Sequence, residues 1–153
     1  MKPNLFDYDA PDRAPGAGDG GDVILRGLTP AEWEAFVGFA EPLRYAAGEP
    51  ILRAGETGRA IYIVKSGHVR GALARGRKAT AELGPGSVFG EIAFFDGAPR
   101  SASLWAVDAV ELLVLPMSAF DKLAAWHPRI ARELLLDLGR VLATRLRQAE
   151  ARN

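Results

Sequence analysis

The chain has 153 residues, 48% of them hydrophobic and 25% charged, and its 19 basic residues balance 19 acidic ones. This is the composition of one ordinary globular domain, and a chain without net charge has no overall field that would attract nucleic acid or an anionic membrane. Cysteine is absent, which excludes disulfides, a thiol nucleophile and a thiolate metal site. We expect a cytoplasmic protein without a membrane span, because the start lacks a signal-peptide pattern and no run of about 18 apolar residues occurs.

The chain is expected to begin with a flexible tail and to fold from residue 23 onward. Residues 1–22 are rich in Asp, Gly and Pro, and such a segment cannot bury enough apolar surface to order itself. A helix is predicted to follow. Thr29 is placed to cap its N-terminus, Pro30 suits the first helical position, and Glu32 completes a capping box.

Short strand-like runs fill residues 41–116. They read PLRYA, PILRA, AIYIVKS, HVRGALA, TAELG, SVFG, SASLWAV and VELLVLP, and glycines at 48, 55, 67, 76, 84, 86 and 97 separate many of them. Many short strands at even spacing favour a closed antiparallel arrangement. We therefore predict a mainly β fold, a β-roll of the jelly-roll type, with flanking helices.

Two helices are predicted after the roll, over about 118–150. Ser118 is the expected cap of the first, which would end near Trp126, and Pro128 opens the second, longer one. Apolar residues of the second helix form a broad stripe at helical spacing. Such a stripe can pack on its own domain and also contact a partner chain or a second copy.

The stretch FGEIAFFDGAPRSAS, residues 89–103, interrupts the strand pattern. A single helical turn from Gly90 to Phe95 would offer free backbone N–H groups, and glycine would let a ligand approach the backbone. Arg100 could pair with a phosphate through its planar guanidinium. Glu91, when ionised, could accept a hydrogen bond from a sugar hydroxyl.

This stretch resembles the phosphate-binding cassette of the cyclic-nucleotide-binding domain family, which includes the catabolite activator protein and the regulatory subunits of protein kinase A. The family pattern is F-G-E, a small or apolar run, then P-R, a small residue, A and S or T. Phe89-Gly90-Glu91 and Pro99-Arg100-Ser101-Ala102-Ser103 match it. The resemblance extends over about residues 24–147, so that 23–153 would form one such domain.

The resemblance implies a role for each matching residue. Arg100 would pair with the cyclic phosphate and Glu91 would bond the ribose 2′-hydroxyl. The remaining ligand contacts would come from residues of the same cassette: Phe89, Gly90, Ile92, Ala93, Ser101 and Ala102. Thr144 and Arg145 on the last helix are the candidates for covering the purine. The expected ligand is cAMP or, second, cGMP, with no other cofactor.

The implied function is a sensor module that repositions its C-terminal helix and signals to a protein partner or through a homodimer. Two alternatives stay open: a scaffold module of the same fold that binds no ligand, and a fragment of a transcription regulator. We expect no direct contact with nucleic acid. His68 and His127 are the only histidines and show no ligand spacing, so we expect no metal site, and no arrangement of catalytic residues indicates an enzyme.

Overall fold

The computed structural model describes residues 23–73 and 82–151. The predicted tail 1–22, the turn at Gly76 and the start of the TAELG run lie outside the described residues. The described elements follow in chain order: α1 (Pro30–Phe39), β1 (Glu41–Tyr45), β2 (Pro50–Leu52), β3 (Ala60–Ser66), β4 (Val69–Leu73), β5 (Val88–Phe89), α2 (Glu91–Asp96), β6 (Ala102–Ala106), β7 (Val110–Pro116), α3 (Met117–Trp126) and α4 (Pro128–Ala151).

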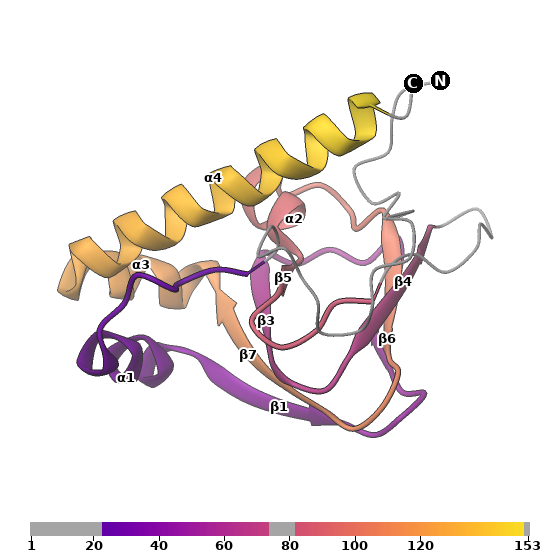
Figure 1. Ribbon diagram of the computed structural model, residues 1–153, viewed down its shortest axis with the longest axis horizontal. Helices are drawn as coiled ribbons and strands as arrows, with labels where there is room; N and C mark the ends of the chain where they lie inside the picture. Colours follow the sequence, from indigo (N-terminus) through magenta and orange to yellow (C-terminus); the bar gives the residue numbers. More distant parts are fainter. Residues whose placement is uncertain (1–22, 74–81, 152–153) are drawn as a thin grey trace.

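The strands form two antiparallel sheets that face each other (Figure 1). One sheet has the order β1-β7-β3-β5 and the other the order β2-β6-β4. Strand β6 alternates buried and half-buried residues, as expected for a strand with one face in the core, whereas β7 is buried at nearly every position. The predicted β-roll with flanking helices is confirmed.

The position of β7 explains its apolar sequence, because it lies between two hydrophobic cores. Leu112 packs into the core inside the roll, together with Phe89 and Leu104. The next residue, Leu113, points the other way and packs with α1 and α4. The helices therefore rest on the outer face of the four-stranded sheet.

Two of the three helix starts predicted from the sequence, those of α1 and α4, are confirmed. At α1 the capping box is present: Glu32 N donates to Thr29 Oγ1 at 3.2 Å, and Thr29 N donates to Glu32 Oε1 at 3.0 Å. Helix α4 begins at Pro128 as predicted. The predicted cap Ser118 was wrong, since α3 begins at Met117 and has Pro116 at its N-cap without a side-chain cap.

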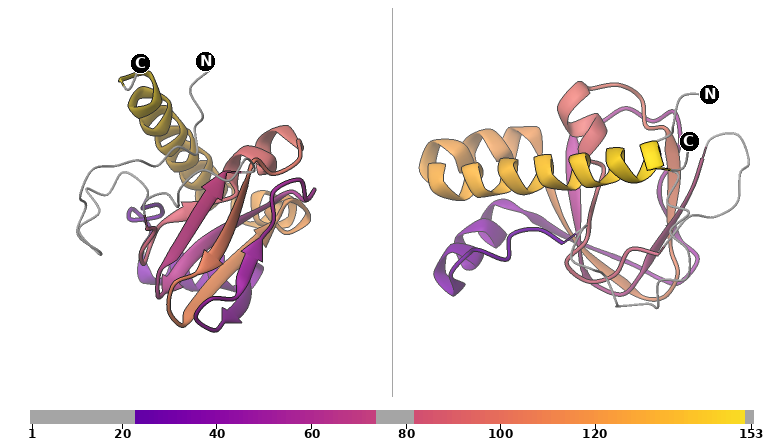
Figure 2. Two further views of the ribbon diagram at one scale, coloured as in Figure 1. Left: turned by 90° about the vertical axis from the view of Figure 1, so that its right-hand side faces the viewer. Right: turned by 45° about the horizontal axis from the view of Figure 1, so that its top comes forward.

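Helix α4 crosses the roll beside α2, and both views of Figure 2 show α2 next to it. None of the helices in the described ranges is long and apolar enough to cross a membrane.

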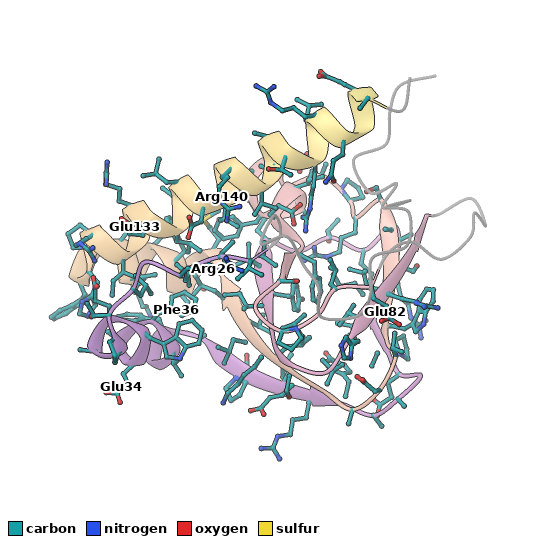
Figure 3. The ribbon with its side chains drawn as sticks, in the orientation of Figure 1. Arg26, Glu34, Phe36, Glu82, Glu133 and Arg140 are labelled. Carbon is teal, nitrogen blue, oxygen red and sulfur yellow. The ribbon has the colours of Figure 1, made fainter. Side chains whose placement is uncertain are left out.

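The N-terminal segment, residues 23–28, runs along α4 before α1 begins. Leu25 N donates to Asp137 Oδ2 at 2.7 Å, and Arg140 Nη2 donates to the Val23 carbonyl at 2.6 Å. Figure 3 shows Arg140 on α4 beside this segment. Val23 also forms a β-bridge with Ser87 at the edge of the roll. The segment thus joins α4 to the sheet.

Candidate functional site

A pocket lies between α2 and the start of β6. About 330 Å³ there is not filled by protein atoms, and part of this space is open solvent. Its lining residues come from the cassette and the three-stranded sheet: Leu52, Gly90, Ile92, Ala93, Pro99, Arg100, Ser101, Ala102 and Leu104. Most are apolar or small, and Arg100 is the charged residue among them.

The loop between β2 and β3 fixes Arg100. Its backbone N–H donates to the Glu56 carbonyl at 2.8 Å, and its carbonyl accepts from Gly55 N at 2.7 Å. The side chain is 7% exposed, and Nη2 donates to the Gly58 carbonyl at 3.2 Å. The guanidinium is therefore held in place by the backbone of one loop.

The charge of Arg100 is not neutralised by a carboxylate in the described part of the chain. Its guanidinium carbon lies 5.4 Å from the centre of the Tyr62 ring, which stacks on Phe89 at 5.0 Å. Burial raises the pKa of the Tyr62 phenol above its usual range, and the nearby Arg100 charge opposes this only in part. Tyr62 is therefore neutral, and the site keeps a net positive charge that suits an anion.

Gly90 allows the cassette backbone to approach Arg100. Its φ is +82°, and a Cβ at this position would lie 3.0 Å from the Ala60 carbonyl oxygen, from Tyr62 and from Arg100. Only glycine accepts both this conformation and this contact without strain. Phe94 N donates to the Gly90 carbonyl at 3.2 Å, so the N–H groups of residues 91–93 precede the first helical bond and have no acceptor within the helix.

Glu91 is fully buried and forms an ion pair with Arg145 of α4. Arg145 Nη1 donates to Glu91 Oε1, and Nη2 donates to the Val88 carbonyl at 2.8 Å. The other carboxylate oxygen, Glu91 Oε2, is buried and has no hydrogen-bond partner among residues 23–73 and 82–151. An ionised oxygen of this kind can accept a hydrogen bond from a hydroxyl group.

The predicted site residues divide into two groups. Those along the pocket are Gly90, Ile92, Ala93, Arg100, Ser101 and Ala102. Phe89 and Glu91 are buried and are not among the lining residues: Phe89 stacks on Tyr62, and Glu91 pairs with Arg145.

The two candidates for covering the purine do not line the pocket. Arg145 is 2% exposed and bound to Glu91, so in this conformation it is a buried partner of the cassette. Its expected role as a cover for the purine stays a prediction. Thr144 is half-buried on α4.

The sequence analysis did not single out Leu52, Leu104, Gly58 or Tyr62. The first two are inward-facing residues of predicted strands, and the alternation along β6 could have identified Leu104. No local pattern marks Gly58 or Tyr62, because their contact with Arg100 depends on the folded loop. Within the described ranges, no group of three or more His, Cys, Asp or Glu residues could hold a metal ion.

A β-roll with a short helix inserted beside a buried arginine offers a site that suits a small anionic ligand. Comparison with known proteins identifies the class. Residues 42–127, more than half of the chain, match the family model described as cyclic nucleotide-binding domain. The chain belongs to this family.

Individual relatives agree with this assignment. The chain is 36% identical to the cyclic AMP receptor protein of Thermus thermophilus over 133 residues, which are 85% of this chain and 60% of the relative. It is 33% identical to a cAMP-dependent protein kinase regulatory subunit of Colletotrichum orbiculare over 100 residues, 65% of this chain and 26% of the relative. The crystal structure of Thermus thermophilus catabolite activator protein superimposes with a TM-score of 0.72 at 36% identity, covering 83% of this chain and 59% of that one.

The chain spans about 60% or less of the length of these relatives. What they share with it is the ligand-binding domain. The two named relatives are regulators by their names, and the match describes a regulatory domain.

Proposed function

We propose that this chain binds a purine 3′,5′-cyclic monophosphate in the pocket beside Arg100. The main observation is that Arg100 lines the pocket and is only 7% exposed. Its partners are a carbonyl and an aromatic ring, and no carboxylate of the described residues pairs with it. A buried guanidinium of this kind is stabilised by an anion. A phosphodiester anion would balance the charge of this guanidinium.

Glu91 gives a reason for a ribose beside the phosphate. Its Oε2 oxygen is a buried acceptor without a donor in the described part of the chain, and an unsatisfied buried group of this kind costs free energy. The ribose 2′-hydroxyl of a cyclic nucleotide would supply the donor. Of the two cyclic nucleotides, cAMP is preferred over cGMP because two of the relatives are named for cAMP.

Helix α4 would transmit the effect of ligand binding to a partner. Because Arg145 binds the same carboxylate that would receive the ribose, ligand binding changes the hydrogen bonding of the residue that holds α4. A ligand can shift two conformations only by its difference in affinity for them. The Glu91–Arg145 pair would supply that difference, and Thr144, one residue away, would be brought over the purine by a movement of α4.

The outer face of α4 suits a protein partner or a second copy of this chain. Leu136 and Leu146 are 55% and 44% exposed. With Gly139 and Ala143 they follow alternating spacings of three and four residues, which is the pattern of a helix packed on another helix. The partner would sense the ligand through this face, and no direct contact with nucleic acid or membrane is part of the proposal.

Calorimetric titration with cAMP, cGMP and AMP tests the function. We expect binding of cAMP, weaker binding of cGMP, and little binding of AMP, whose phosphate is open and more highly charged. Arg100→Leu should abolish binding, whereas Arg53→Gln should not, because Arg53 is an exposed residue of the β2–β3 loop and does not line the pocket. If the unaltered chain binds neither cyclic nucleotide, the scaffold alternative is correct.

A further inference from the structure

Arg59 contacts the far end of the cassette helix from outside the pocket. It is exposed and directly precedes β3. Its Nε donates to the Phe94 carbonyl at 3.0 Å, and its Nη2 donates to the Phe95 carbonyl at 2.8 Å. Both carbonyls belong to the last turn of α2, where the helix offers no N–H donor of its own.

Helix α2 depends on such outside support because it has only six residues. Helices this short are not stable by themselves. Its C-cap, Gly97, turns away with φ +70° and donates to the Ala93 carbonyl. A planar cation that binds two adjacent carbonyls satisfies two of the remaining acceptors and also interacts favourably with the negative end of the helix.

The backbone of residues 58 and 59 also contacts the side chain of Arg100 and the start of α3. The carbonyl of the preceding residue, Gly58, accepts the hydrogen bond from Arg100 Nη2 at 3.2 Å. The carbonyl of Arg59 itself accepts from Met117 N at 2.8 Å, where α3 begins. Two adjacent residues therefore touch the pocket arginine, the cassette helix and the first helix after the roll.

We infer that Arg59 is a positioning residue for the candidate site. It holds α2 in the orientation that places Gly90 against Arg100 and keeps Ile92 and Ala93 along the pocket. The inference rests on the proposed function. A ligand that binds to a preformed cassette avoids the entropy cost of ordering it, so the loss of Arg59 should weaken binding although Arg59 does not line the pocket.

Calorimetric titration of Arg59→Gln with cAMP, at a temperature well below unfolding, tests the inference. The loss of both charge-assisted hydrogen bonds should weaken binding by about tenfold. Arg53→Gln is the matched control, because it removes an equal charge from the same loop and should bind as the unaltered chain does. Arg59→Lys keeps the charge but not the paired donors, so it should restore only part of the affinity.

Amide hydrogen exchange distinguishes positioning from general destabilisation. Without ligand, Arg59→Gln should exchange faster than the unaltered chain at Phe94 and Gly97 but not along β3 and β7, and saturating cAMP should restore the protection. Equal affinities of Arg59→Gln and Arg53→Gln would overturn the inference while leaving the proposed function intact. Faster exchange throughout the roll would also overturn it, since Arg59 would then support the whole fold. If the unaltered chain does not bind, the proposed function itself fails.

Discussion

Glu91 and Arg145 form a buried ion pair that joins the cassette helix to the last helix. Their side chains are 0% and 1% exposed, and the residues are 54 positions apart in the chain. A buried charge pair is costly to desolvate and is most costly when one member is lost. The position of α4 is therefore tied to the residue proposed to receive the ribose.

Removing either member of this pair should destabilise the fold strongly. We expect Arg145→Met to lower the free energy of unfolding by about 3–5 kcal/mol, because it leaves the Glu91 charge buried and unpaired. The decrease in the free energy of unfolding of the double variant, Arg145→Met with Glu91→Gln, should be much smaller than the sum of the decreases in the two single variants. Urea unfolding of the three variants measures this coupling, and additive losses would show that the pair is not coupled.

Gly90→Ala should reduce both stability and ligand affinity. Alanine at φ +82° is strained by about 1–2 kcal/mol, and its Cβ would also press on Arg100 and Tyr62. Gly48→Ala is the matched control: its φ is +83°, but nothing lies within 4 Å of the added Cβ. Thermal unfolding should show lower stability in both variants. Titration with cAMP should show lower affinity only in Gly90→Ala. Equal affinities of the two would contradict the close contact.

The aromatic ring of Tyr62, and not its hydroxyl, should matter for binding. Tyr62→Leu removes the ring on which the Arg100 guanidinium lies, an interaction of about 0.5–2 kcal/mol. Tyr62→Phe keeps the ring and should bind cAMP as the unaltered chain does. Calorimetric titration compares the two, and a loss in Tyr62→Phe as large as in Tyr62→Leu would contradict the role of the ring.

Stability should fall at acidic pH partly through Asp108. The hydrogen bond to the His68 side chain at 2.7 Å, with a second bond to the His68 backbone, lowers the pKa of Asp108 below its ordinary 3.8. The unfolded chain therefore binds more protons than the folded one between these two pKa values, so this contribution is complete above the ordinary pKa and is lost as the pH falls through the folded pKa.

Thermal unfolding of the unaltered chain and of Asp108→Asn between about pH 6 and pH 2 tests this dependence. The two curves should approach each other as the pH falls below the ordinary carboxyl range. The pKa of Glu32 is also lowered, through hydrogen bonds with the Thr29 backbone and then with Arg129. The stability curve of Glu32→Gln should therefore approach that of the unaltered chain in the same way, and it serves as the comparison for Asp108→Asn. A constant difference between the Asp108→Asn curve and the unaltered one would contradict the assignment.

Local patterns predicted the elements well where the signal lies within a few residues. The capping box of Thr29 and Glu32, the start of α4 at Pro128 and the interruption of the strands by α2 are of this kind. The TAELG run was a weaker prediction: of its described part, Leu83 forms only an isolated bridge with Val69. A bridge of this kind depends on the neighbouring strand, which the local sequence does not specify.

The contacts around the candidate site could be predicted only in part for the same reason. Six of the cassette residues chosen from the sequence line the pocket, and their contact with a ligand stays a prediction. The partner of Glu91 lies 54 residues away on a helix whose rotation the sequence does not give. Gly58 and Arg59 reach Arg100 and α2 across distances of about 35–42 residues in the chain, and no spacing rule predicts such contacts.

The N-terminal segment gives the last helix a threshold for movement. To slide along its axis, α4 must release Leu25 from Asp137 and Val23 from Arg140, as well as Glu91 from Arg145. Leu25 holds a left-handed backbone with φ +62°, a conformation that persists in a leucine only when its surroundings impose it. In the proposed mechanism, three contacts that break together would make α4 change between two positions in a single step.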